Sequence, residues 1–125
     1  AQSQKANTGV DLITDLSFEY NSGVKADLYC SFTENTASEA VIKFENAEIK
    51  MNSRFHESDK LSITHNSSEA LINYDYQAKG YHFEIVHAQE CLRKNLKESP
   101  LMPHAFSILL IKTLDEIRQK IGLEY

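Results

Sequence analysis

The chain has 125 residues, which is the length of one ordinary domain. Its formal net charge is -5, so it lacks the excess of basic side chains that is typical of a nucleic-acid-binding protein. With 42% hydrophobic and 25% charged residues, and no apolar run near the roughly 20 residues of a membrane helix, the composition argues against disorder and against a membrane span.

The beginning of the chain carries little periodicity. Residues 1–9 are polar, and we expect a flexible arm or a truncation stump there, followed by a single domain over 10–125. No signal peptide opens the chain, so we expect a cytoplasmic protein. The two cysteines, Cys30 and Cys91, have no CxxC spacing and are expected to be two buried thiols in a reducing compartment. The glycosylation sequon at Asn66 means little without a secretion signal.

Residues 11–76 alternate between apolar and polar side chains, which is the period of a half-buried strand. Turn residues such as Gly23 separate the alternating runs, which predicts an antiparallel meander. The runs cover 11–20, 24–32, 40–44, 47–52, a short segment around 61–63, and 70–76.

The period changes to that of a helix after Gly80. A first helix is predicted over 81–96, ended by Pro100, because the residue before a proline resists helical geometry. A second amphipathic helix is predicted from Pro103 to about residue 121, with Gly122 as a left-handed cap. We therefore predict an α+β domain with a mostly antiparallel open sheet of about six strands, one face of which is covered by two C-terminal helices.

The opposite face of this sheet is polar with a few apolar exceptions. These exceptions are Ile13, Tyr29, Val41 and Leu71. They indicate either a partner surface, such as a dimer face, or scattered exposed apolar groups, and the sequence leaves both open.

No complete catalytic motif is present. The four glycines are isolated, which excludes a phosphate-binding loop and a dinucleotide fingerprint. The five histidines have no HExxH context and predict no metal site. Cys91 and His87 are four residues apart and form a conceivable nucleophile pair, but a thiol beside a buried stripe is usually inert.

Tyrosines gather where the last strand meets the first helix. Tyr74, Tyr76 and Tyr81 form either core and rim packing or the wall of a pocket with polar tips.

Three segments carry a family resemblance: residues 80–84 (GYHFE), 90–100 (ECLRKNLKESP), and 114–118 (LDEIR) with 121–125 (IGLEY). Together they resemble the end of the Gfo/Idh/MocA oxidoreductases, most closely the dimeric dihydrodiol dehydrogenase and xylose dehydrogenase branch. The resemblance covers nearly the whole chain. The 90–100 run is its most specific part, and the strand region is similar mainly in layout.

The resemblance implies a C-terminal domain of the glyceraldehyde-3-phosphate dehydrogenase-like type. In that family an N-terminal Rossmann domain binds NAD or NADP, and a catalytic lysine lies in a Glu-Lys-Pro motif. This chain contains neither, so no catalytic or cofactor-binding residue is carried over. The resemblance does imply that Tyr74 and Tyr76, with Gln77 beside them, border the substrate pocket. It also implies a homo-oligomer formed through the open sheet face.

The expected function is thus the substrate-binding and dimerisation domain of an NAD(P)-dependent dehydrogenase acting on a sugar or diol CH-OH group. The part present here would be inactive by itself, and its partner would be its own missing Rossmann domain. A free-standing α+β ligand-binding or protein-interaction module is the alternative, and a small hydrolase using the histidines is a third. Neither the substrate, the choice of cofactor nor the oligomer size follows from the residues.

Overall fold

The computed structural model describes residues 1–52, 54–74 and 80–124. These described residues form seven strands, two α-helices and one short 3-10 helix, so the predicted α+β class is confirmed. The chain divides into two compact units, one formed by residues 1–36 with 98–125 and the other by residues 37–97. The prediction of one domain over 10–125 stays a prediction.

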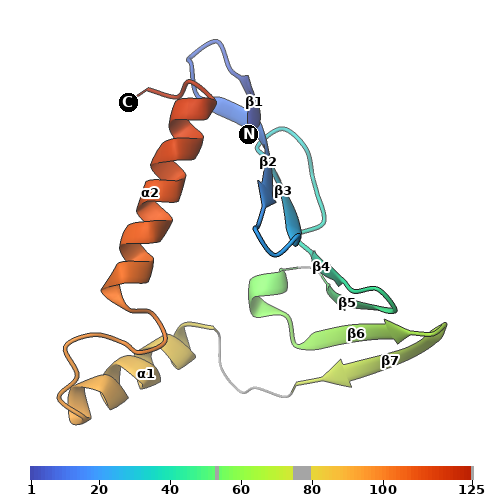
Figure 1. The fold of residues 1–125 in the computed structure, drawn as a ribbon, viewed down its shortest axis with the longest axis vertical. Helices are drawn as coiled ribbons and strands as arrows, with labels where there is room; N and C mark the ends of the chain where they lie inside the picture. The colour runs from blue at the N-terminus through green and yellow to red at the C-terminus, as the bar shows by residue number, and fades with distance from the viewer. Residues whose placement is uncertain (53, 75–79, 125) are drawn as a thin grey trace. The chain divides into compact units, whose positions relative to one another are not determined.

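The first unit holds a three-stranded antiparallel sheet, made of β1 (Gln2–Lys5), β2 (Asp11–Glu19) and β3 (Lys25–Ser31), in that order (Figure 1). Gly23 closes the β2–β3 turn with a φ of 83°, a conformation that glycine adopts without steric cost. The register places Leu16 opposite Leu28, so the apolar residues of the two strands share one face.

The second unit holds a four-stranded antiparallel sheet. Its strands are β4 (Ala40–Lys43), β5 (Ala47–Met51), β6 (Lys60–His65) and β7 (Ser68–Asn73), in chain order (Figure 1), with the 3-10 helix η1 (Phe55–Glu57) between β5 and β6. Asn66 and Ser67 join β6 to β7 with φ angles of 47° and 63°, the left-handed pair of a tight hairpin turn. Two rows of apolar residues cross one face of this sheet: Ala40, Met51, Leu61 and Ile72, and beside them Ile42, Ile49, Ile63 and Ala70.

The predicted single sheet of about six strands is wrong in number and in connection. Seven strands form two sheets, and no ladder joins β3 to β4 among the described residues. The additional strand is β1, whose sequence QSQK has no apolar alternation and which is held by backbone pairing to β2. Periodicity detects strands that bury one face, so it missed a polar edge strand, and it does not say which strands pair.

Helix α1 spans Tyr81–Arg93 and ends before the predicted residue 96. Asn95 takes a φ of 54°, and its N–H donates to the Leu92 carbonyl at 3.0 Å. The N–H of Leu96 donates to the Cys91 carbonyl, also at 3.0 Å. This pair of bonds is a Schellman motif, with asparagine in the position that glycine usually takes.

Helix α2 spans His104–Lys120, close to the predicted limits. Gly122 has a φ of 64° and ends the helix with the same pair of bonds, from Gly122 to the Gln119 carbonyl and from Leu123 to the Arg118 carbonyl. The amino group of Lys5 on β1 donates to the Gly122 carbonyl, which places a cation at the negative end of the helix. Neither described helix has the length and apolar content needed to cross a membrane.

Burial is low throughout the described residues. No hydrophobic side chain among them is buried, and Thr14, at 5% exposure, is the buried polar residue. On α2, Phe106, Leu109 and Leu110 are all about half exposed. The predicted covering of the sheet by the helices therefore stays a prediction.

Candidate functional site

Of the three residues predicted to form the pocket wall, the structure describes Tyr74. Tyr74 follows β7, and its N–H donates to the Asp59 carbonyl at 2.7 Å, which extends the pairing of β6 and β7 by one residue. Tyr74 is 50% exposed, and its role as a pocket wall stays a prediction. Tyr76 and Gln77 lie outside the described residues.

The two predicted dimer-face residues of the second unit lie on one face of its sheet. Val41 and Leu71 occupy the two outer strands of one row, with Lys50 and Ser62 between them. Val41 is 40% and Leu71 56% exposed. The ammonium of Lys50 lies 2.9 Å from a carboxylate oxygen of Glu39, so the charge in the middle of this row already has a partner.

The other two predicted residues share a face of the first sheet. Tyr29 pairs with Asp15, and Ile13 pairs with Ser31, so Ile13 and Tyr29 are diagonal neighbours across β2 and β3. The Tyr29 hydroxyl donates to Glu34 at 2.5 Å. This hydrogen bond raises the pKa of Tyr29 above its ordinary value, because ionisation would place two negative charges side by side.

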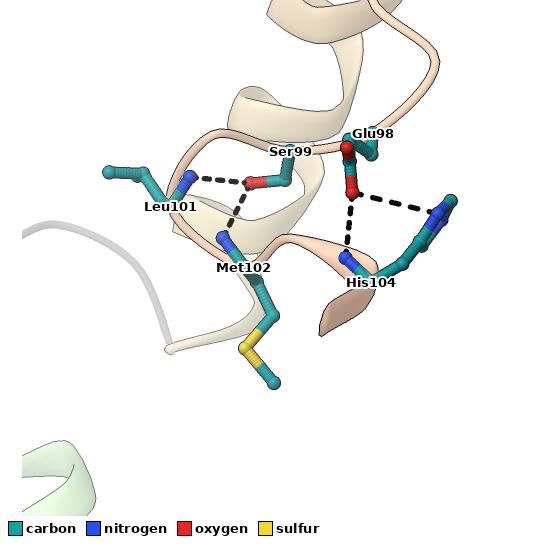
Figure 2. Close-up of polar contacts among 5 residues, drawn as sticks. All are labelled: Glu98, Ser99, Leu101, Met102 and His104. Carbon is teal, nitrogen blue, oxygen red and sulfur yellow. Dashed lines mark hydrogen bonds and ion pairs between the residues drawn. The ribbon is translucent and has the colours of Figure 1, made fainter. Parts of the chain in front are cut away.

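The connection between the two helices is a small polar network (Figure 2). Pro103 precedes α2 in an extended conformation, and proline has no side-chain acceptor for the first helical N–H. Glu98 supplies one instead, since its carboxylate accepts the His104 N–H at 2.7 Å. The same oxygen lies 3.5 Å from Nδ1 of His104, which adds an ion pair when the imidazole is protonated.

Ser99 organises the other side of this connection. Its hydroxyl accepts the N–H groups of Leu101 and Met102 at 3.1 and 3.0 Å (Figure 2). The side chains of these two residues are 79% and 42% exposed, so a hydrogen-bonded turn presents apolar groups to solvent. The segment 90–100, which is the most specific part of the family resemblance, therefore ends in a hydrogen-bonded connection. The sequence did not predict these hydrogen bonds.

Two cysteine environments are defined. Cys91 and His87 meet on α1, with Sγ 3.5 Å from Nε2 and both side chains half-buried. Cys30 lies exposed on β3, and its thiol donates to the Thr14 carbonyl at 3.8 Å. Both thiols are free, but the prediction that both are buried is wrong, because Cys30 is exposed and Cys91 is half-buried. The i,i+4 spacing of His87 and Cys91 was the sequence signal for their contact.

No group of three or more metal-ligating side chains occurs within the described ranges. A shallow, open depression of about 300 Å³ lies at the β4–β5 and β6–β7 turns, lined in part by Phe44 and Asn66. None of the described residues predicted for the pocket wall or the dimer face lines it. The depression is therefore separate from the surfaces that the sequence had singled out.

Comparison with known proteins gives a consistent result. The trans-1,2-dihydrobenzene-1,2-diol dehydrogenase of Macaca fascicularis is 30% identical over 98% of this chain, and the mouse protein of the same name is 29% identical over 94%. The human protein of that name is 28% identical over 98% of the chain. No protein-family model matches the chain. The chain spans about 38% of the length of these relatives. Over nearly its whole length, the chain is thus similar to part of the dihydrodiol dehydrogenases.

Proposed function

We propose that this chain is the C-terminal substrate-binding and dimerisation part of a longer NAD(P)-dependent oxidoreductase of the Gfo/Idh/MocA type. The carrying observation is the similarity to dihydrodiol dehydrogenases over 98% of the chain. The proposed reaction moves a hydride between the CH-OH carbon of a diol or sugar and a nicotinamide.

The residues of this chain do not fit a nicotinamide site. A dinucleotide-binding turn needs glycines grouped between a parallel strand and a helix, and here the four glycines are isolated. All described strand pairs are antiparallel. We therefore derive no step through the cofactor from this chain, and its binding is assigned to another part of the longer protein.

The exposed apolar faces support the proposal. A sheet face such as the one carrying Ile42 and Ile72 is stable when something apolar covers it. A domain that packs on the rest of a longer enzyme, and on a second subunit, supplies such a cover. Among the described residues, Tyr74 is the one proposed for the substrate side. The residues proposed for the subunit side are Ile13 and Tyr29 on the first sheet and Val41 and Leu71 on the second.

The experiment compares this chain with the protein translated from its complete reading frame. We expect no NAD(P)H binding by the 125-residue chain in calorimetry, and both binding and diol oxidation by the longer protein. Micromolar cofactor binding by the chain alone would overturn the assignment. A complete frame that lacks GxGxxG and Glu-Lys-Pro would favour the free-standing binding module instead.

The same longer protein tests the pocket wall. Changing Tyr74→Ala should raise KM for the diol several-fold with KM for the cofactor unchanged, because a lost wall weakens substrate contact only. Tyr20→Ala, at a half-exposed tyrosine after β2, is the matched control. An equal rise in KM for the diol in both variants would contradict the role of Tyr74 as a pocket wall.

A further inference from the structure

The thiols of the two cysteines make hydrogen bonds to different kinds of partner, one that can take up a proton and one that cannot. The Cys91 thiol lies against an imidazole nitrogen, with Sγ 3.5 Å from Nε2 of His87, one turn earlier on α1. The Cys30 thiol lies against a backbone carbonyl, that of Thr14, at 3.8 Å. Cys30 is nevertheless the more exposed of the two. Exposure and hydrogen bonding therefore make contrary predictions about which thiol reacts faster.

The partner decides how easily the proton leaves. The thiolate, not the thiol, is the nucleophile. A histidine whose ring carries its proton on Nδ1 offers Nε2 as an acceptor for the thiol proton. A backbone carbonyl, the partner of the Cys30 thiol, accepts a hydrogen bond but cannot take the proton.

We propose that Cys91 is a site of reversible modification by low-molecular-weight disulfides, with His87 acting as its base. The Cys91 proton passes to Nε2 of His87, and the resulting thiolate attacks one sulfur of the disulfide. A new S–S bond forms to Cys91 as the S–S bond of the reagent breaks, and the second sulfur leaves as a thiolate with the electron pair. The Cys91 sulfur is oxidised and the leaving sulfur is reduced, so no further oxidant is needed.

The position of Cys91 gives the modification a structural consequence. Its carbonyl accepts the Leu96 N–H that closes α1, immediately before the connection organised by Glu98 and Ser99. A bulky group on this half-buried thiol would therefore sit at the hydrogen-bonded end of α1. Reduction by excess thiol would restore the original side chain.

The first experiment measures the reaction of each thiol with the chromogenic disulfide dithiobis(nitrobenzoate). Cys30→Ser leaves Cys91 alone, and Cys91→Ser leaves Cys30 alone. We expect Cys91 to react at least about tenfold faster than Cys30 near neutral pH, despite its lower exposure. A Cys30 rate equal to or above that of Cys91 would overturn the proposal, and it would show that access alone governs the two thiols.

The second experiment removes the base. In the Cys30→Ser background, His87→Ala should slow Cys91 to about the rate of Cys30, and added imidazole should restore part of the rate. His82→Ala is the matched control, because His82 lies on the same helix with its ring edge-on to Phe83. Its rate should be unchanged. Circular dichroism checks that helix content is retained, and in the chain with both cysteines the Cys30 rate serves as an internal standard. An unchanged rate in His87→Ala, or an equal loss in His82→Ala, would contradict the role of His87.

The third experiment uses glutathione disulfide and peptide mass spectrometry. We expect one glutathionyl group on Cys91, removed by dithiothreitol, and little on Cys30. Preferential labelling of Cys30 would refute the site. These experiments use the 125-residue chain and do not depend on its proposed place in an oxidoreductase.

Discussion

Among the described residues, Tyr29 is the one whose pKa is clearly shifted. Its hydroxyl donates to Glu34 at 2.5 Å, and Asp15 lies opposite it on β2. The Glu34 bond, and the negative charges of Glu34 and Asp15, raise the pKa of Tyr29 above the ordinary value of 10.0. Because the bond favours the protonated phenol, its contribution to folding is present at neutral pH. It is lost as the pH rises through the pKa of Tyr29 in the folded state.

Changing Glu34→Gln should move the pKa of Tyr29 down toward its ordinary value, since the amide keeps an acceptor but removes the charge. Tyrosinate absorbance measured against pH reports the shift, and the difference from a Tyr29→Phe chain isolates this residue. Glu45→Gln, in the β4–β5 turn, is the control and should leave the titration unchanged. A Tyr29 titration that does not move in Glu34→Gln would show that the bond is absent in solution.

Among the elements, α2 begins in an unusual way. The residue before its first turn is Pro103, which has no capping side chain, and the carboxylate of Glu98 takes over that role. A negative group at this end also interacts favourably with the helix dipole. The sequence placed Pro103 at the start of the helix correctly but gave no sign that a residue five positions earlier would complete the cap.

Changing Glu98→Ala should lower the free energy of unfolding by about 1 kcal/mol, the typical cost of a lost N-cap. Glu98→Gln should cost less, because its amide oxygen still accepts the His104 N–H while the charge is gone. Urea unfolding followed by circular dichroism measures both changes. Glu116→Ala, at an exposed glutamate within the same helix, is the control. If Glu98→Ala and Glu116→Ala had the same effect, the cap would contribute nothing.

The two helix ends show what local sequence can and cannot predict. Gly122 was predicted as the cap of α2, because glycine adopts positive φ without strain, and the structure confirms it. The end of α1 was placed at residue 96, since the nearest strong signal was Pro100. The helix stops earlier because Asn95 adopts the left-handed conformation. Asparagine tolerates this conformation, but an asparagine in a sequence does not by itself predict a helix end.

At the scale of the whole molecule, large apolar side chains are exposed on both units. Leu28 and Phe32 are 50% and 86% exposed in the first unit, and Ile42 and Phe44 are 46% and 59% exposed in the second. Clustered apolar groups of this kind mark surfaces that another protein segment covers. We therefore expect the chain to bury apolar surface against another protein segment or a second copy.

Self-association through the proposed sheet face is testable on this chain. Light scattering should show oligomers in the unchanged chain and a monomer in the double variant Val41→Lys with Leu71→Lys, which alters one face of the second sheet, because two buried lysines are costly. Ser22→Lys with Asn46→Lys adds the same charge in two turns and should stay oligomeric. An unchanged chain that is monomeric at every concentration, or a control that also dissociates, would refute this face as the interface.

The sequence by itself determined the kind of elements, their approximate limits and the face on which each strand residue lies. Val41 and Leu71 share a face of the second sheet, and Ile13 and Tyr29 share a face of the first, because side-chain direction in a strand alternates with a period of two. The four were predicted to lie on one face of a single sheet, and the structure divides them between two sheets. Glycine and proline marked most of the turns for equally local reasons. These features depend on the backbone within a few residues.

Only the tertiary structure decided which groups pair with one another when no local sequence signal links them. It separated seven described strands into two sheets, added the polar strand β1, brought Glu98 to the start of α2, and set the Cys30 thiol against the Thr14 carbonyl. Each strand, and each hydrogen-bonding side chain, could pair with several partners that its local sequence suits about equally well. The fold selects one of them by backbone register and by the conformation of each connection, which no periodic pattern in the sequence encodes.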